Sequence, residues 1–219
     1  MATVPFDPRQ LAIDAIAGEA AVAAERLHPE WLRRRFAEPP DWVPEVADEA
    51  RFRAAEPTRA SVLVPLVQRE GGLTILFTER TANLSSHAGQ ISFPGGRHEL
   101  SDRSPVDTAL RETEEEVGLA RRHVDVLGLL PEYHTGTGYR VTPVVALVAP
   151  PFELRADPAE VAEIFEVPLA FLMDGLNHQR LSAMRPEGRR SFYAMPYQRF
   201  YIWGATAGML RNLFHFLRA

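Results

Sequence analysis

The stretch Arg111-Glu112-Thr113-Glu114-Glu115-Glu116-Val117-Gly118 carries four glutamates. We predict a helix from Pro105 to Val117, and a rotation of about 100° per residue places Glu112, Glu115 and Glu116 on one face. Like charges at this spacing repel and weaken a helix, so a merely solvated acidic face, which is the alternative, would be locally unfavourable. A hard divalent cation removes the conflict because Mg²⁺ and Mn²⁺ take carboxylate oxygens as ligands. The stretch therefore predicts a helix that holds Mg²⁺ or Mn²⁺.

The residues around this stretch frame the predicted helix. Ser104 suits the N-cap, and Asp107 supplies the acid of a capping box. Gly118 is a natural end. A second, mostly apolar face should pack on a sheet, and its members are Val106, Leu110, Thr113 and Val117. Upstream, Phe93-Pro94-Gly95-Gly96 predicts a tight turn whose glycine pair lets a main-chain carbonyl approach an ion.

From Ala60 onward the rest of the chain consists mostly of short strand-like segments between turns. Gly71-Gly72 predicts a hairpin turn between strands at 61–67 and 73–78. Further strands are expected at 91–93, 124–130, 141–148, 180–184, 191–196 and 199–203. A segment at 160–165 leads into a short helix at 169–173, and a helix at 205–217 closes the chain. This order of elements indicates an α/β fold with a mixed sheet.

The first 58 residues have a different texture. Leu11, Ile13 and Ile16 recur at helical spacing and predict one amphipathic helix over 8–27. Prolines forbid a long helix over 28–58, while tryptophans there are too apolar for a free linker. We therefore expect an N-terminal helical and Pro-rich extension, 1–58, packed on a main domain, 59–219. An arm for a dimer or another partner is the alternative.

Composition bounds the function. The 219 residues, 46% of them apolar, suffice for one large globular domain with an appendage. Cysteine and lysine are both absent, which excludes disulfides, thiol nucleophiles and Schiff-base chemistry. The net charge of -5 argues against a nucleic-acid or anionic membrane surface. We expect a small-molecule substrate, no nucleic-acid or membrane partner and a cytoplasmic location, and a homodimer stays open.

The acidic stretch and the glycine turn together resemble the Nudix box of the Nudix hydrolase family. The matching residues are Gly96, Arg111-Glu112, Glu115-Glu116 and Gly118-Leu119. One extra residue precedes Arg111, and Asp102 stands in place of the first glutamate of the box, where it either supports the metal shell or only the start of the helix. These departures, with segments 76–80, 87–96, 138–143 and 202–207, are similar to the coenzyme A diphosphatase subgroup. The resemblance covers about residues 61–217 and implies a Nudix-like mixed sheet sandwiched between helices.

This resemblance implies hydrolysis of coenzyme A or its thioesters at the diphosphate, giving adenosine 3',5'-bisphosphate and a 4'-phosphopantetheine product, with Mg²⁺ or Mn²⁺ as cofactor. Glu112 and Glu116 are expected as metal ligands, and Glu115 as a further ligand or the general base. Arg111 is expected to orient the carboxylates, and the main-chain oxygen of Gly96 to complete the metal shell. Glu115, Glu116 and Arg111 are thus the predicted catalytic residues.

Four residues are predicted to bind substrate. Arg80 suits a phosphate, although a surface salt bridge is the alternative. His87 either touches substrate or only holds its loop. Gly95 belongs to the tight turn beside the predicted metal site. Tyr139 follows a glycine-rich loop and could stack on a base.

Two residues favour other substrates. Ser85 stands where the subgroup pattern has a second arginine, and Thr81 replaces a serine or alanine. ADP-ribose or a dinucleotide is therefore an alternative substrate. A non-catalytic nucleotide-sensing module is a third hypothesis, favoured only by the N-terminal extension.

Overall fold

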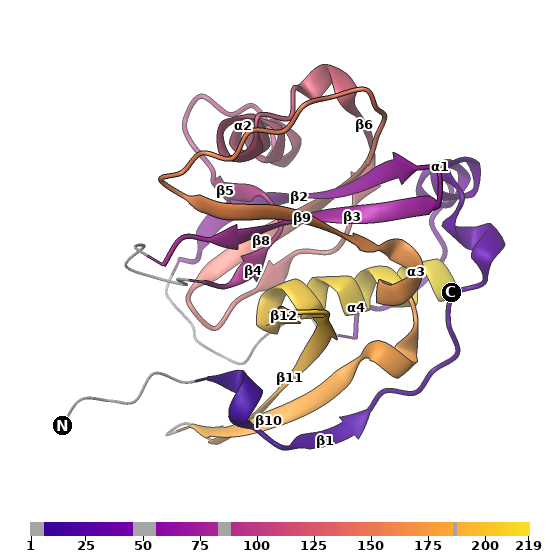
Figure 1. Ribbon diagram of the computed structural model, residues 1–219, viewed down its shortest axis with the longest axis vertical. Coiled ribbons are helices and arrows are strands. Elements are labelled where there is room, and N and C mark those ends of the chain that lie inside the picture. Colours follow the sequence, from indigo (N-terminus) through magenta and orange to yellow (C-terminus); the bar gives the residue numbers. More distant parts are fainter. Residues whose placement is uncertain (1–6, 46–55, 83–88, 186–187) are drawn as a thin grey trace.

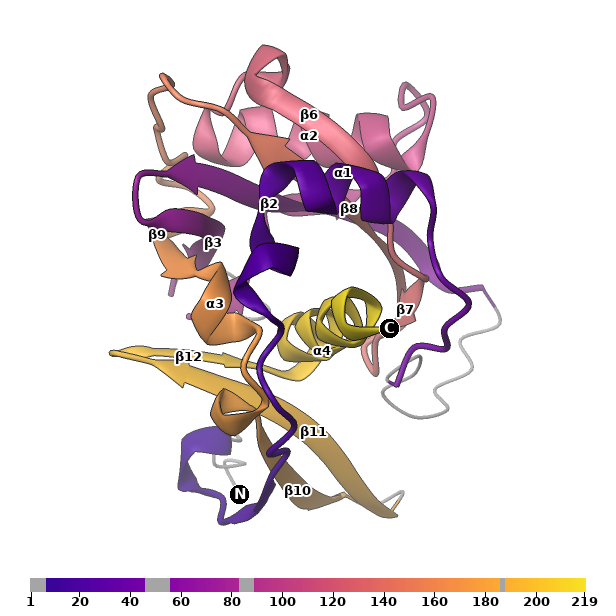
Figure 2. The same cartoon turned by 90° about the vertical axis from the view of Figure 1, so that its right-hand side faces the viewer.

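The computed structural model describes residues 7–45, 56–82, 89–185 and 188–219. Its elements form four layers: α2, an eight-stranded sheet, α4 and a four-stranded sheet (Figures 1 and 2). The helices are α1 (Pro29–Ala37), α2 (Pro105–Val117), α3 (Leu169–Leu172) and α4 (Gly204–Arg218). The large sheet contains β2 (Thr58–Arg69), β3 (Gly72–Arg80), β4 (Ile91–Ser92), β5 (Gly95–Arg97), β6 (Val124–Leu129), β7 (Tyr133–His134), β8 (Tyr139–Val148) and β9 (Val161–Pro168). The small sheet contains β1 (Ile13–Ile16), β10 (Gln179–Arg185), β11 (Gly188–Tyr197) and β12 (Phe200–Trp203).

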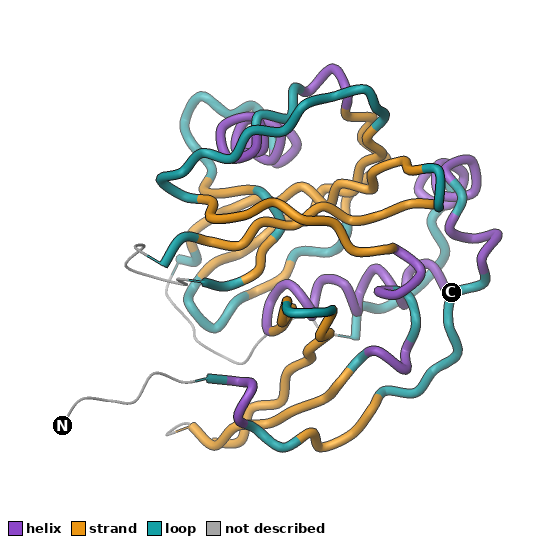
Figure 3. Tube along the Cα trace, in the orientation of Figure 1, coloured by secondary structure: helices purple, strands orange, loops and turns teal. Residues whose placement is uncertain are grey.

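The large sheet is mixed, and this confirms the predicted fold class of a mixed sheet flanked by helices. Its main order is β4-β3-β2-β8-β6, with β5 on β2, β7 on β8 and β9 on β3. The pair β2·β8 is parallel, and the other pairs are antiparallel. Arg69 pairs with Gly72, so the predicted hairpin turn is present. Strands β10, β11 and β12 were predicted from the sequence, but their place in a second sheet was not (Figure 3).

Alternation along β2 separates two apolar cores on the two faces of the large sheet. Leu63 and Val67 are fully buried in the core beneath α2, whereas Val64 and Leu66 lie in the core that includes α4. Full burial of one such side chain contributes about 1.5–3 kcal/mol. The same alternation determines which side chains of β2 face helix α2.

Helix α2 has the predicted bounds and caps. The Ser104 hydroxyl accepts a hydrogen bond from the Asp107 amide at 3.1 Å, and Gly118 closes the helix at a φ of 69°. The Asp107 carboxylate accepts from the Arg103 amide rather than from that of Ser104, so the capping box is shifted by one residue. Ala109 and Val117 are fully buried against the sheet, which holds the opposite, acidic face of the helix in place.

The helix predicted over 8–27 is wrong. Pro8–Gln10 and Ala24–Leu27 are short 3₁₀ turns, and β1 between them pairs antiparallel with β10. The Ala17 amide then donates to the His178 carbonyl at 2.9 Å. The free edge of β10 offers backbone partners to this segment, and that pairing outweighs the local helical spacing.

Helix α1 of the N-terminal segment covers β6 and packs against the end of α4. Leu32 of α1 is fully buried, and the ring of Phe36 lies tilted against that of Phe216 with 4.7 Å between the ring centroids. Arg33 forms an exposed ion pair with Asp125 at 2.8 Å. The division of the chain at residue 58 stays a prediction. In the described parts of the chain, no helix is long and apolar enough to cross a membrane.

Candidate active site

Glu112 and Glu116 lie one turn apart on α2 and face Gly95 and Gly96. These two glycines belong to strand β5 rather than to the predicted tight turn, because they pair with Val62 and Ser61 of β2. The Gly95 amide donates to Glu116 Oε2 at 3.1 Å. A Cβ atom built on Gly96 would lie 2.4 Å from the Glu112 carboxyl carbon, so a larger residue would displace that carboxylate. The glycine at position 96 therefore allows the β5 backbone to lie directly against the acidic face of α2.

Burial disfavours the ionised form of both of these carboxyl groups. Glu116 is 4% exposed, and its burial raises its pKa to about 8, although the Gly95 amide and Arg80 oppose the rise. Burial also raises the pKa of Glu112, against the attraction of Arg111 at 3.0 Å. Two adjacent carboxyl groups with raised pKa values mark a place where additional positive charge would be stabilising.

Arg111 holds this cluster together by binding Asp102 first. Its Nε donates to Asp102 Oδ1 at 2.9 Å and its Nη2 to Asp102 Oδ2 at 3.0 Å, a bidentate pair. The bidentate hydrogen bonds hold the pKa of Asp102 well below its usual range and raise that of Arg111. The remaining Nη1 lies 3.0 Å from both Glu112 Oε1 and Glu115 Oε2. Asp102 thus fixes the guanidinium that orients the two glutamates.

Glu115 lies at the outer rim of the cluster. Its side chain is 59% exposed, in contrast to the buried Glu116. It also lines an open groove of about 1050 Å³ beside the end of α2, together with Phe152 and Arg155. The three predicted glutamates are therefore graded from buried to solvent-facing.

A fourth carboxylate, Glu160, acts on the cluster through its charge and was not among the residues predicted from the sequence. Its charge raises the pKa of both Glu112 and Glu116. Its carbonyl accepts from the Thr81 amide at 2.9 Å, and the Asp157 amide donates to the Glu116 carbonyl at 2.9 Å, so the segment before β9 is bound to α2. Periodicity could not reveal Glu160, because it lies outside a helix and is brought in by tertiary contacts.

Of the residues predicted to bind substrate, Arg80 and Gly95 lie at the carboxylate cluster, whereas Tyr139 lies beside Arg97. Arg80 ends β3 with its Nη1 3.9 Å from Glu116 Oε1, inside the cluster. Gly95 contacts Glu116 through its amide. Tyr139 begins β8 and contacts Arg97, which sequence analysis did not single out. His87 and Ser85 lie outside the described residues, and all four substrate assignments stay predictions.

The cluster fits a divalent cation. The carboxylates of Glu112 and Glu116 converge on Gly95 and Gly96 of β5, and carboxylate oxygens are ligands suited to Mg²⁺ or Mn²⁺. Their roles as ligands stay a prediction.

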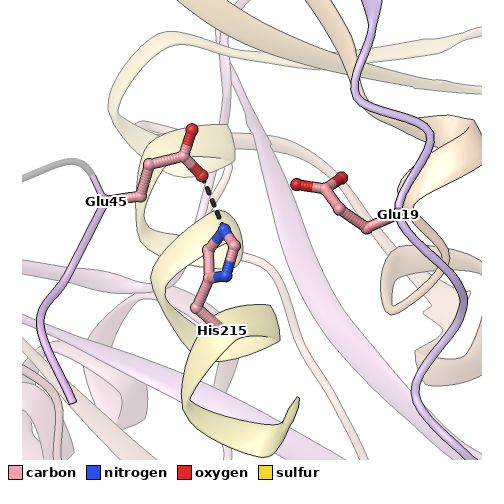
Figure 4. Close-up of side chains that lie close together, drawn as sticks. All are labelled: Glu19, Glu45 and His215. Atoms are coloured by element: carbon pink, nitrogen blue, oxygen red, sulfur yellow. Dashed lines mark hydrogen bonds and ion pairs between the residues drawn. The ribbon is translucent and has the colours of Figure 1, made fainter. Parts of the chain in front are cut away.

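A second cluster, Glu19, Glu45 and His215, offers three ligand atoms within 4.8 Å of one another (Figure 4). Arg211 Nη2 lies 2.7 Å from Glu19 Oε1, 2.5 Å from Glu45 Oε2 and 2.7 Å from His215 Nε2. The buried guanidinium thus contacts all three groups itself. Hydrogen bonds from Arg211 to Glu19, and from His215, Tyr193 and Arg211 to Glu45, lower both glutamate pKa values to about 2 despite burial. This cluster is therefore neutralised from within the chain.

The chain matches the NUDIX domain family over residues 57–186. A Photorhabdus laumondii protein named uncharacterized Nudix hydrolase NudL is 43% identical over 154 residues, 70% of this chain and 82% of the relative. Proteins of that name from Cronobacter sakazakii and Escherichia coli are 42% and 40% identical over 156 residues, 71% of this chain and 80% of each relative.

Solved structures include a Nudix hydrolase from M. smegmatis, RenU, at 26% identity and a TM-score of 0.45, covering 57% of this chain and 78% of that one. The C. elegans Ap4A hydrolase binary complex is 18% identical with a TM-score of 0.44, covering 50% and 80%. The family match spans more than half of the chain, so the predicted family is confirmed, whereas the coenzyme A diphosphatase subgroup stays a prediction. The chain belongs to the Nudix hydrolase family.

Proposed function

We propose that this Nudix hydrolase, which acts on a diphosphate-containing substrate, cleaves coenzyme A or its thioesters to adenosine 3',5'-bisphosphate and a 4'-phosphopantetheine product. The observation that carries the reaction is the cluster of Glu112, Glu116 and Glu160, with a buried carboxyl group at its centre. The substrate rests on the resemblance of segments 87–96 and 138–143 to the coenzyme A diphosphatase subgroup.

Nudix hydrolases generally use divalent metal ions, and Glu112, Glu116 and the main-chain oxygen of Gly96 would hold Mg²⁺ or Mn²⁺ here. A bound ion would acidify water and neutralise developing charge on phosphorus. Arg111, fixed by Asp102, keeps Glu112 and Glu115 oriented. The solvent-facing Glu115 and the neighbouring Glu160 are the two candidates to accept the proton of the attacking water.

The surroundings of the cluster suit a long substrate. Arg80 can bind a phosphate oxygen, because its Nη1 lies 3.9 Å from Glu116 and its side chain is 26% exposed. The groove beside Glu115 is lined by both acidic and basic residues. Because these charges offset one another, the groove suits an uncharged polar chain better than a phosphate. Phosphopantetheine carries such a chain beyond its phosphate.

The test is incubation of the purified protein with coenzyme A, ADP-ribose or NADH in Mg²⁺ or Mn²⁺, with EDTA controls. We expect release of adenosine 3',5'-bisphosphate from coenzyme A at the highest kcat/KM, and none in EDTA. Preference for ADP-ribose or NADH would overturn the substrate and retain the reaction. If none of the three substrates were hydrolysed with metal present, a nucleotide-sensing module would be favoured.

A further inference from the structure

Arg97, the residue after Gly96, is a positively charged side chain whose described side-chain partner is the neutral Tyr139. Its guanidinium lies over the ring of Tyr139, 5.5 Å from the centroid. Its Nε and Nη2 donate to the Tyr139 hydroxyl oxygen at 3.1 and 2.6 Å. Among the described residues, no aspartate or glutamate forms an ion pair with Arg97. Its positive charge is therefore not neutralised by those residues.

The other arginines at the cluster differ from Arg97. Arg111 is bound by Asp102 and two glutamates, and Arg80 faces Glu116. Their charges already balance carboxylates that the chain supplies. Arg97 is exposed and keeps donor capacity, because both of its described hydrogen bonds end on one phenol oxygen.

The backbone fixes where Arg97 stands relative to the carboxylates. Its carbonyl accepts from Arg111 Nη2 at 3.1 Å, and its strand position pairs with Ala60 of β2. Successive side chains on a strand point to opposite faces. Since position 96 faces Glu112, the side chain of Arg97 leaves β5 on the other face, toward Tyr139. A group bound by Arg97 is therefore distinct from the diphosphate held at the carboxylates.

We propose that Arg97, held by Tyr139, binds a second phosphate of the substrate, a phosphomonoester on the ribose. This rests on the proposed function, because coenzyme A carries a 3'-phosphate in addition to its diphosphate. A guanidinium binds phosphate through two parallel N–H donors, and the Tyr139 hydroxyl retains its own proton to donate to the same group. The site therefore selects nucleotides with a ribose phosphate over those without one.

The test is calorimetric binding of adenosine 3',5'-bisphosphate and of 5'-AMP, in Mg²⁺, to the wild type and to Arg97→Gln. We expect the wild type to prefer the bisphosphate by about tenfold or more, the size of a charge-assisted contact. Arg97→Gln should bring the two affinities within about twofold. Tyr139→Phe, which keeps the ring, should reduce the preference by about threefold.

Arg59→Gln is the matched control. Arg59 precedes Ala60 on β2, so it carries the same charge on the opposite face of the sheet. It should keep the wild-type preference. Equal binding of the two nucleotides by the wild type, or equal losses in Arg97→Gln and Arg59→Gln, would overturn the proposal.

The binding measurement does not depend on turnover, so it separates the two proposals. A protein that prefers the bisphosphate through Arg97 but does not hydrolyse coenzyme A would refute the proposed function alone. A protein that hydrolyses coenzyme A with unchanged KM in Arg97→Gln would refute the role of Arg97 alone. Thermal unfolding of each variant checks that it folds.

Discussion

The two carboxylate clusters of this protein differ in where their positive charge comes from. Glu19 and Glu45 surround the buried Arg211, and their pKa values fall to about 2. On α2, by contrast, burial raises the pKa of Glu116 to about 8. The first cluster contains its own cation, Arg211, whereas in the second the buried Glu116 has its nearest described guanidinium nitrogen, Arg80 Nη1, 3.9 Å away.

Arg111 explains why the cluster on α2 is not neutralised in the same way. Its bidentate hydrogen bonds go to Asp102, and only Nη1 is left near Glu112 and Glu115. Among the described residues no guanidinium hydrogen-bonds to Glu116, because Arg80 Nη1 lies 3.9 Å from its Oε1. Proximity of acids is therefore a poor sign of a metal site by itself, and the position of the nearest guanidinium separates the two cases.

Replacement of the buried acid should have the largest effect. Glu116→Gln should lower kcat by about 10²–10³-fold, because it removes charge that holds a cation at the developing phosphoryl charge. Its Tm without metal should not fall, since the amide avoids ionisation of a buried carboxyl group. Steady-state kinetics with Mg²⁺ and calorimetry without it check both statements.

Glu114→Gln is the matched control for that variant. Glu114 lies on the same helix, but its carboxylate accepts from Arg121 at 2.9 Å outside the cluster. It should keep wild-type kcat and the wild-type increase of Tm on addition of Mg²⁺. If Glu114→Gln lost as much kcat as Glu116→Gln, the effect would come from the overall negative charge of α2 and not from a metal site at Glu116.

Removal of the internal cation should have the next largest effect, this time on stability. Arg211→Met leaves Glu19 and Glu45 facing each other and should cost about 3 kcal/mol of unfolding free energy. For a chain of this size the Tm should fall by on the order of 10 °C. The kcat of the folded fraction should stay near the wild-type value, because Arg211 is not part of the α2 cluster.

The same variant offers a sharper comparison. Without the guanidinium, Glu19, Glu45 and His215 become a free donor set within 4.8 Å, suited to Zn²⁺ or Mn²⁺. Mn²⁺ at concentrations that saturate the α2 cluster should therefore recover more Tm in Arg211→Met than in the wild type. An equal gain in both proteins would show that Arg211 does not occupy the position of a cation.

The part of the site carried by one helix could be predicted from the sequence. Helical spacing places Glu112, Glu115 and Glu116 together, and the caps Ser104 and Gly118 set the bounds of α2. Local patterns suffice there because each signal acts within a few residues.

Residues brought in by tertiary contacts could not be predicted. The segment of Glu160 is held by backbone hydrogen bonds from Thr81 to Glu160 and from Asp157 to Glu116. Arg97 is placed beside Tyr139, on the other face of β5, by its strand pairing with Ala60. The helix expected over 8–27 failed for the same reason, because the edge of β10 captures β1. Long-range pairing leaves no periodic trace in these segments.

The smallest effect concerns acid. Burial lowers the pKa of His178, which accepts from Arg211, to about 4, and Glu19 and Glu45 are held near 2. In each case the unfolded chain binds protons more readily than the folded one, so stability rises with pH. The contribution of His178 should be lost as the pH falls from about 6.5 to 4, and that of the glutamates from about 4.5 to 2. Above about pH 4.5 the raised pKa of Glu116 acts in the opposite sense, so the comparison is made below that pH. Urea unfolding of the metal-free protein from pH 4.5 to pH 3.5 should show a falling free energy of unfolding, with a shallower slope in Glu45→Gln. The exposed Glu38→Gln should keep the wild-type slope, and identical slopes in all three proteins would mean that the cluster around Arg211 does not depend on its ionised carboxylates.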